Sequence, residues 1–398
     1  MSTYLKVPLD KYKCGQGRSA PPFPQFTKPE PIGFMSINGD AREYGNDAGH
    51  LGYFWRIPEP PLDLSAGIDQ VHRKAVDPEY FDIHMFCKFI QNHRELLHPT
   101  ESGALKLDAD FVTFRGILRL IMCLPYDNKE LCLRATQLNG TIYLSKLETD
   151  ADREDRAKMT QHHLNMCSWG YKFEQYCLSA EPNVEPTTSV PVNENDEFNC
   201  FFRTKLGGLR VIFGAEMDGI KSDKSVDLND PKVLANLKFV ELKTTSVNMT
   251  PKQLRTFDRY KSLNWWAQSF LVGIESIFAG LRDNNGIVHN IREFIVSDLP
   301  RNKYWSPASM MLFLQHVLQE LKMLMDIIND PYAVVQLDYK PGYSGIKYTI
   351  IRRSDEPQRT PNGHNELNKV HRFIPDSYRN LLNGTPLSAT ATNLTNSD

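Results

Sequence analysis

Residues 239–245 read FVELKTT, and this short stretch decides how the rest of the sequence is interpreted. Apolar and β-branched residues fill most of it, which is typical of a β-strand. Because successive side chains of a strand point to opposite faces, Glu241 and Lys243 are expected to share one face. Taken alone, this pair would be an ion pair on a solvated face.

A second strand-like stretch upstream, VIFGAEMDGI at 211–220, changes that interpretation. Its alternation predicts that Glu216 and Asp218 also share a face, where like charges repel, and strongly so when they are partly buried. The spacing between Asp218 and Glu241 leaves room for a loop and a returning strand. Neighbouring strands would then gather Glu216, Asp218, Glu241 and Lys243 into one cluster.

Composition places limits on the function. The chain has 398 residues, of which 41% are hydrophobic and 24% charged, as in ordinary soluble globular proteins. A formal net charge of −2 excludes a basic field over the whole protein, so any nucleic-acid site must be a local patch or groove. Seven cysteines without a CxxC pair favour a reduced compartment, cytosol or nucleus. We find no signal peptide and no membrane-spanning run, so no membrane association is expected.

Periodicity and turn signals predict a mixture of helices and strands. Helices are expected at 79–96, about 109–122, 152–177, 251–268 and 307–328. A hairpin is expected at 131–147, and strands at 201–206, 209–220, 237–245, 269–283, 332–339 and 346–353. Extended or irregular chain is expected in the Pro-rich segments 19–32 and 58–63, in the loop 181–197, and in a disordered tail from 384. We therefore predict one domain over 1–383, of α/β or mixed α+β class, with helices packed on a sheet.

The acidic cluster predicts a metal site, because three carboxylates that face one another require cations. Oxygen ligands select hard ions, Mg²⁺ or Mn²⁺. A lysine beside such ions suits a phosphate oxygen, as a compact charge that stabilises the transition state. Acids, divalent metal and lysine together are what phosphodiester or pyrophosphate hydrolysis requires. An acid followed by E-x-K on an adjacent strand is also the pattern of the PD-(D/E)xK nuclease core.

Three further segments carry candidate residues. In WGYKFEQYC (169–177), Glu174 shares a helical face with Gly170, whose lack of a side chain allows close packing or ligand approach. Gln268 lies where a helix is expected to pass into a strand. Arg115 adjoins Gly116 inside a predicted helix, where the arginine guanidinium and the backbone N–H groups together can bind a phosphate. Each of these alone would be an ordinary surface or capping residue.

At this point the motifs resemble a known family. TFRG (113–116), GYKFE (170–174), AEMD (215–218), VELK (240–243) and WWAQSFLVGI (265–274) follow one another in the order found in the DXO-type RNA decapping nucleases. PIGFMS (31–36) resembles an early segment of that family more weakly. The resemblance covers roughly residues 110 to 285, and is strongest to the fungal proteins that partner the nuclear 5′→3′ exoribonuclease.

The resemblance implies roles for individual residues. Metal ligands are implied at Glu174, Asp218, Glu241 and the main-chain carbonyl of Leu242, with Glu216 holding a metal-bound water or a second ion. The implied catalytic set is Glu216, Asp218, Glu241, Lys243 and Gln268. Lys243 and Gln268 would contact the scissile phosphate or the attacking water. The RNA 5′ region would lie against Phe114, Arg115, Gly116, Glu216, Lys243 and Gln268.

The same resemblance implies a fold and an activity. The fold would be a large, curved mixed sheet plus a smaller sheet, flanked by helices. The activity would be Mg²⁺- or Mn²⁺-dependent hydrolysis at RNA 5′ ends: pyrophosphate release from 5′-triphosphate RNA, removal of incomplete or NAD caps, and 5′→3′ digestion. A nuclear location and a nuclear 5′→3′ exoribonuclease partner are implied as well. Two alternatives stay open: a PD-(D/E)xK DNA nuclease, and a non-catalytic stabiliser of an exoribonuclease.

Overall fold

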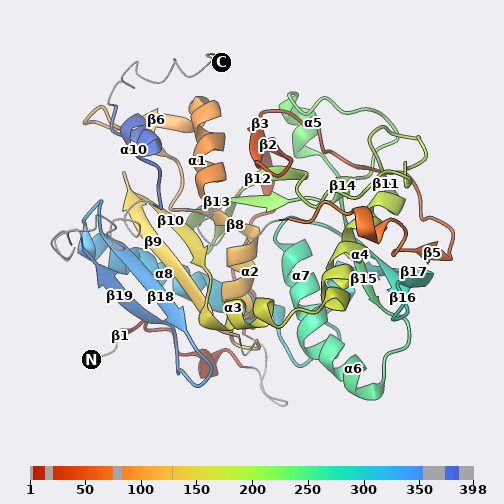
Figure 1. The fold of residues 1–398 in the computed structure, drawn as a ribbon. Coiled ribbons are helices and arrows are strands. Elements are labelled where there is room, and N and C mark those ends of the chain that lie inside the picture. The colour runs from red at the N-terminus through yellow and green to blue at the C-terminus, as the bar shows by residue number, and fades with distance from the viewer. Residues whose placement is uncertain (1–2, 14–20, 75–82, 128, 353–372, 385–398) are drawn as a thin grey trace, which may run out of the picture.

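The computed structural model describes residues 3–13, 21–74, 83–127, 129–352 and 373–384 (Figure 1). Its largest element is a ten-stranded mixed sheet. In spatial order the strands are β1 (Thr3–Tyr4), β19 (Lys347–Ile351), β18 (Val334–Tyr339), β9 (Leu131–Leu138), β10 (Thr141–Leu147), β8 (Phe111–Phe114), β13 (Leu209–Glu216), β12 (Glu197–Leu206), β2 (Glu30–Asn38) and β3 (Glu43–Gly45). The strand β8 runs parallel to both of its neighbours, β10 and β13. The ends of these three strands therefore meet at the same edge of the sheet.

A second sheet of seven strands lies beside the first, on the right in Figure 1. Its order is β11 (Leu178–Ser179), β4 (Tyr53–Phe54), β14 (Gly219–Ile220), β15 (Phe239–Ser246), β16 (Ser276–Arg282), β17 (Ile287–Ile295) and β5 (Leu62–Asp63). A small hairpin pairs β6 (Leu97–Pro99) with β7 (Leu105–Leu107). The predicted class, a mixed fold with a large and a smaller sheet, is confirmed.

Helices cover both sheets. They are α1 (Ile83–Asn92), α2 (Arg115–Cys123), α3 (Asp150–Ala157), α4 (Gln161–Cys177), α5 (Pro231–Ala235), α6 (Pro251–Thr256), α7 (Ser262–Phe270), α8 (Pro307–Ile328) and α10 (Asp376–Leu382). A π-helical turn, η4 (Phe257–Lys261), joins α6 to α7. Short 3₁₀ turns are η1 (Leu9–Lys11), η2 (Ile68–Gln70), η3 (Arg94–Leu96) and η5 (Val296–Asp298).

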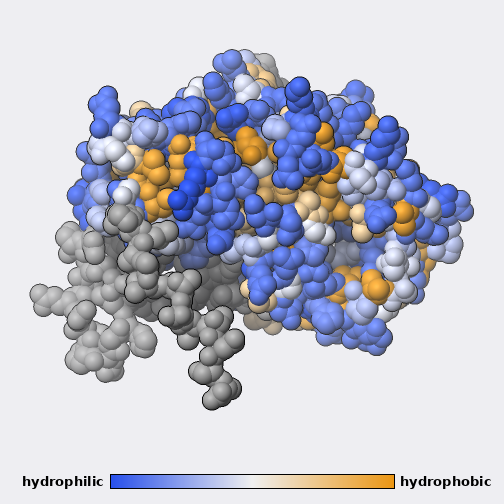
Figure 2. All heavy atoms as spheres, turned by 90° about the horizontal axis from the view of Figure 1, so that it is seen from above, coloured by the Kyte–Doolittle hydropathy of each residue, from blue (hydrophilic) through white to orange (hydrophobic). Residues whose placement is uncertain are grey.

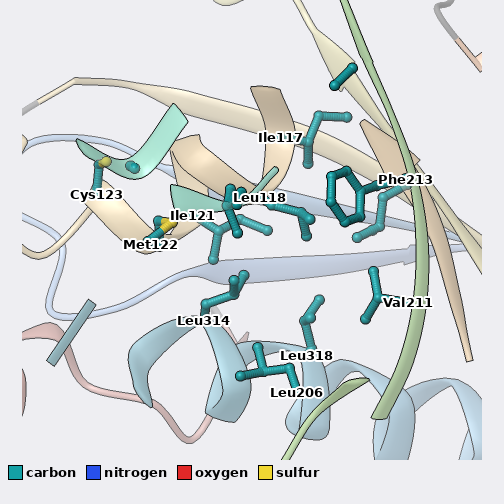
Figure 3. Packing of buried hydrophobic residues seen from close by; sticks show 14 of the residues in the cluster. Ile117, Leu118, Ile121, Met122, Cys123, Leu206, Val211, Phe213, Leu314 and Leu318 are labelled. Atoms are coloured by element: carbon teal, nitrogen blue, oxygen red, sulfur yellow. The ribbon is translucent and has the colours of Figure 1, made fainter. Parts of the chain in front are cut away.

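The two faces of the large sheet are buried against different helices. Alternation along β8 sends Phe111 to one face and Val112 to the other, and these two residues belong to separate core clusters. On the first face, α2 packs against α8 and β13, with Ile117, Leu118, Leu314 and Phe213 in close proximity (Figure 3). On the second face, α1 and α10 complete the core. This packing fixes the start of α2 at the end of β8.

Several predicted elements are confirmed. The hairpin at 131–147 forms β9 and β10, and Asn139 and Gly140 adopt the positive φ angles that its two-residue turn requires. The long helix begins at Pro307 as predicted, with the Ser306 side chain accepting a hydrogen bond from the backbone N–H of Ser309. FVELKTT lies within β15.

The helix expected from about Ala109 to Met122 is wrong in its first half. Residues Phe111–Phe114 form the strand β8, and α2 begins only at Arg115. Both halves are apolar and buried, so their periodicity does not separate a buried strand from a buried helix. The correction matters because it places Arg115 at a strand-to-helix junction instead of inside a helix.

Other boundaries also differ from the prediction. The helix expected at 152–177 is two helices, because Thr160 forms a capping box with His163 and starts α4 anew. The helix expected at 251–268 extends to Phe270, with η4 within it, and Gly273 at φ 74° follows it, so the strand expected from 269 begins only at Ser276.

Four predictions remain, one wholly and three partly inside the described residues. The Pro-rich segment 58–63 was expected to stay unpacked, but its last two residues form β5 and pair with β17. Within 19–32, β2 already begins at Glu30. The start of the helix expected at 79–96, and the tail beyond 384, lie outside the described residues.

No helix in the described ranges is both long and apolar enough to cross a lipid bilayer. Figure 2 shows the face seen from above Figure 1, where hydrophilic residues predominate and hydrophobic residues appear in patches between them.

The core model is tested by two methionines on the same helix. Met325 of α8 is 1% exposed and Met323 is 53% exposed. We expect Met325→Ala to lower the free energy of unfolding by about 2 to 5 kcal/mol, because it leaves a cavity. Met323→Ala, the matched control, should change it by less than about 0.5 kcal/mol. Urea unfolding of both variants measures the difference, and equal losses would contradict the packing of α8.

Candidate active site

Glu241 is the centre of the site. It is fully buried on β15, and its carboxylate has three partners. Lys243 forms an ion pair with Oε1, and the Gln268 side-chain amide donates to the same oxygen at 2.7 Å. Arg115 Nη1 approaches Oε2 at 3.4 Å. Val240 and Leu242, on the opposite face of the strand, pack into the core beneath α4. The predicted alternation of FVELKTT is therefore confirmed.

Arg115 joins the two sheets. It follows β8 directly, and β8 and β13 run parallel with Phe114 opposite Gly214, so Arg115 lies beside the end of β13. Its second guanidinium nitrogen, Nη2, donates to the main-chain carbonyl of Glu216 at 2.7 Å. The guanidinium thereby links the last residue of a strand in the large sheet to Glu241 in the smaller one.

Asp218 lies where the chain passes between the sheets. The stretch at 211–220 was expected to be one strand with Glu216 and Asp218 on one face, and this is wrong. β13 ends at Glu216, Met217 donates its N–H to the Phe198 carbonyl, and β14 starts at Gly219 in the other sheet. Asp218 Oδ2 accepts a hydrogen bond of 2.6 Å from the backbone N–H of Leu242. The two acids still belong to one cluster, because the crossover keeps them next to β15.

Glu174 completes the cluster from α4, which packs against β15. Its carboxyl group interacts with the charges of Asp218, Lys243, Glu216 and Glu241. The expected close packing at Gly170 is not found, because a Cβ atom built there would meet no atom within 4 Å. Open space for a ligand remains the interpretation of that glycine.

The cluster carries more negative charge than its surroundings neutralise. Burial, followed by repulsion from Asp218, raises the pKa of Glu174 well above its usual range. Burial and the neighbouring Glu241 raise the pKa of Asp218 to about 6. Burial and the nearby Glu197 raise the pKa of Glu216 to about 7. Glu216 is the exposed carboxylate of the cluster, so water screens its charge. The repulsion between carboxylates therefore acts mainly on Glu174 and Asp218.

Glu241 and Lys243 show the opposite behaviour. Burial alone would raise the pKa of Glu241, but Lys243 and Arg115 outweigh it and hold that pKa below its usual value. Burial alone would lower the pKa of Lys243, but the carboxylates of Glu241 and Asp218 outweigh it and raise that pKa. Both groups are therefore ionised at neutral pH.

A pocket of about 280 Å³ opens beside this cluster. Phe114, Arg115, Gly116, Glu216 and Gln268, five of the predicted substrate-binding residues, line it. No described atom lies within 4 Å of a Cβ built on Gly116, so the pocket is open at the start of α2. The structure thus brings together every predicted site residue, either on the pocket wall or in the carboxylate cluster behind it.

Sequence reasoning missed part of the pocket wall, which Arg42, Lys74, Arg119, Glu197 and Asn199 also line. Buried Glu197 forms ion pairs with Arg42, at 2.9 Å, and with Lys74. Asn199 stands opposite Glu216 in the β12–β13 ladder. Extending the predicted strand 201–206 backwards in steps of two would have found Glu197 and Asn199. Arg42 and Lys74 come from irregular segments that carry no such signal.

The donor set fits a hard divalent cation. Four carboxylates lie near enough to interact electrostatically, three of them have raised pKa values, and oxygen is the ligand atom that Mg²⁺ and Mn²⁺ prefer. In the described part of the chain, no three His, Cys, Asp or Glu side chains converge closely enough to hold an ion as they stand. Instead, Lys243, Gln268 and Arg115 contact the Glu241 carboxylate, and the Leu242 N–H donates to Asp218. An ion would replace the positive charge that these donors supply.

The charge imbalance predicts a pH dependence of stability. The pKa of Asp218 lies at about 6 in the fold, above its ordinary value of 3.8, so this carboxyl binds its proton more tightly when folded. This tighter proton binding stabilises the fold fully at pH values below the ordinary pKa of 3.8, and the stabilisation is lost as pH rises through about 6. In chelator, Asp218→Asn and wild type should melt alike near pH 4. The variant should become the more stable protein towards pH 7.

Melting temperatures measured across this pH range test the prediction, with Asp223→Asn, an exposed acid in the following loop, as the control. A variant that is less stable than wild type at pH 7 would show that Asp218 is held by a structural hydrogen bond and not strained by like charges.

Comparisons with known proteins agree with this geometry. A family model described as RAI1 like PD-(D/E)XK nuclease matches residues 27–379. The "Decapping and exoribonuclease protein Rai1" of Drosophila melanogaster is 44% identical over 372 residues, covering 92% of this chain and 98% of that protein. The human "Decapping and exoribonuclease protein" is 31% identical, covering 81% of each chain.

Solved structures show the same fold. Candida albicans Rai1, crystallised in complex with pU5-Mn²⁺, superposes with a TM-score of 0.72 at 20% identity, covering 96% of this chain and 100% of that one. Schizosaccharomyces pombe Rai1 gives a TM-score of 0.63 at 24% identity, covering 83% and 97%. Since the family model spans most of the sequence and its motif residues form the cluster around Glu241, the chain belongs to the RAI1-like PD-(D/E)XK nuclease family.

Proposed function

We propose that this protein is a Mg²⁺- or Mn²⁺-dependent hydrolase of RNA 5′ ends. Its substrates would be 5′-triphosphate RNA, from which it releases pyrophosphate, and RNA with incomplete or NAD caps, with 5′→3′ digestion as a further activity. The observation that carries the proposal is the buried Glu241, held by Lys243, Gln268 and Arg115 beside a pocket next to three carboxyl groups with raised pKa values. The names of the relatives, decapping and exoribonuclease proteins, agree with it.

Different residues of the site would bind the metal ion, orient the attacking water and bind the phosphates. Glu174, Asp218 and Glu241 would hold the ion, with the Leu242 carbonyl and Glu216 as further ligands. When bound, a divalent ion lowers the pKa of a water and offsets charge on the phosphate. Lys243 is charged and, once released from Glu241, can reach a phosphate oxygen and stabilise the transition state. The Gln268 side-chain amide can orient the attacking water, and Arg115 can bind the RNA 5′ phosphates with its fork.

The proposal extends to a partner and a location. Association with a nuclear 5′→3′ exoribonuclease, and residence in the nucleus, both follow from the family resemblance of the motifs. A DNA nuclease of the PD-(D/E)xK type would use the same carboxylates, and a requirement for the 2′-OH separates the two substrates.

Activity with purified protein tests the main proposal. We expect Mn²⁺-dependent product from 5′-triphosphate RNA and from RNA with an unmethylated cap, and none in EDTA. Glu216→Ala/Asp218→Ala should lose this turnover by at least about 100-fold, because charge stabilisation in the transition state is lost. Product from 5′-monophosphate RNA would add exonuclease activity. Unchanged turnover in the double variant would refute the assigned carboxylates, and no product from any RNA would favour a non-catalytic stabiliser of an exoribonuclease.

Lys243 is predicted to act in the transition state more than in binding. Lys243→Ala should lower kcat about 100-fold or more while KM for 5′-triphosphate RNA stays within a few-fold of wild type. Lys238→Ala removes an exposed lysine just before the same strand and is the matched control. Single-turnover rates and KM decide the case: an unchanged rate with weakened binding would reassign Lys243 to substrate affinity.

A further inference from the structure

Two elements of the active site continue past it in the same direction. On β15, Glu241, Lys243 and Thr245 follow at intervals of two and share one face. On η4 and α7, Gln268, Asn264 and Lys261 follow at intervals of four and three, which also places them on one face. The two faces meet again beyond the catalytic residues, where Lys261 Nζ contacts Thr245 Oγ1 at 3.3 Å.

Beyond this contact the surface is hollowed twice. The inner hollow, of about 1050 Å³, is lined by Thr245, Lys261, Asn264 and Arg282, among other residues. The outer hollow, of about 810 Å³, lies further along α6 and η4. The two hollows share four lining residues, Asp127, Lys252, Thr256 and Tyr260. Together they continue the active-site face along α7, η4 and α6, the helical column at the bottom of Figure 1.

The outer hollow carries a stripe of positive charge. Lys252, Arg255 and Arg259 are exposed and follow one another at intervals of three and four, so they lie on one helical face. None of the three forms an ion pair with another described residue. Among the described residues that line this hollow, Asp127 is the one acid. Like charges at this spacing destabilise a helix unless an anion joins them.

Aromatic residues also line the outer hollow: Tyr126, Tyr260, Tyr304 and the buried Trp305 and Tyr339. Tyr304 is 58% exposed, so one of its faces is available for stacking. The guanidinium of Arg259 lies 5.2 Å from the ring centroid of Tyr260. A groove that pairs cations without ion-pair partners among the described residues with the exposed ring of Tyr304 fits single-stranded nucleic acid, in which phosphates and base faces alternate along the chain.

The distance from the catalytic residues sets which nucleotides can reach this groove. Gln268 and Arg255 are separated by roughly 20 Å at the rise of a helix. At about 3.4 Å per stacked nucleotide, that span corresponds to roughly six nucleotides. We propose that the outer hollow binds the RNA strand downstream of the scissile bond, from about the sixth nucleotide onward, with Arg255 and Arg259 on its phosphates and Tyr304 against a base. This inference rests on the function proposed above.

The test compares short and long substrates. Pyrophosphate release is measured with Mn²⁺ on 5′-triphosphate RNAs of four and of twenty nucleotides, for wild type and for Arg255→Ala/Arg259→Ala. The variant should raise KM about tenfold for the long RNA, because two phosphate contacts are lost, and leave the short RNA unchanged. Between 50 and 200 mM salt, the affinity for the long RNA falls as salt rises. The slope of log affinity against log salt concentration should be smaller in magnitude for the variant than for wild type, by about 1.4. Tyr304→Ala should raise the same KM without changing that slope.

The control removes two exposed lysines on helices at the opposite side of the molecule, Lys88→Ala/Lys232→Ala, and should behave like wild type. If the Arg255→Ala/Arg259→Ala variant processes both RNAs as wild type does, the groove does not bind RNA, and the stripe would suit an acidic protein partner instead. If wild type hydrolyses neither RNA, the proposed function fails separately. Fluorescence anisotropy with the twenty-nucleotide RNA then tests whether the outer hollow binds RNA. Weaker binding by the Arg255→Ala/Arg259→Ala variant than by wild type supports the proposal, and equal binding overturns it.

Discussion

The carboxylate of Glu241 is the constraint on which the rest of the site depends. A fully buried acid needs positive or donating partners, and here they come from three places: Lys243 two residues along the same strand, Gln268 on α7, and Arg115 at the start of α2. Each partner lies on an element fixed by the core: α2 and α7 contribute residues to one hydrophobic cluster, and β15 packs through Val240 and Leu242 into another. The three partners of Glu241 therefore owe their positions to packing on both sheets.

Charged residues near the active site and along α7, η4 and α6 are grouped by sign. At one end, burial and the charge of neighbouring acids raise the pKa values of Glu174, Glu216 and Asp218. In the middle, Lys261 lies close enough to Arg282 and Lys243 that burial and these two cations lower its pKa to about 8. At the far end lies the stripe on α6 and η4. The net charge of −2, which sums 46 Lys and Arg against 48 Asp and Glu over the whole chain, does not reveal this local arrangement. A polyanion can satisfy the basic end while divalent ions satisfy the acidic one.

The sequence alone predicted which residues form the site better than it predicted the secondary-structure elements that carry them. Glu241 and Lys243 were found because strict alternation in FVELKTT puts them on one face, and that rule is local. Asp218 was placed in the right cluster for the wrong reason, since nothing in AEMD reveals that the chain leaves one sheet for another. Arg115 was found but assigned to a helix interior, because the apolar strand before it has no period of its own. Arg42 and Lys74 could not be found, since long-range contacts alone bring them to Glu197.

The passage of the chain from the large sheet to the small one at Met217 and Asp218 has a consequence for how the enzyme matures. Arg115 and Glu241 are 126 residues apart, and Arg119 reaches Asn264 across 145. Contacts of such sequence separation form late, because the loop between them must be closed first. A chain still emerging from the ribosome has no Glu241 to pair with Arg115 until both sheets exist. The contacts that hold Glu241 therefore depend on segments far apart in the sequence, and they form only after the chain has been made through residue 241 and both sheets have come together.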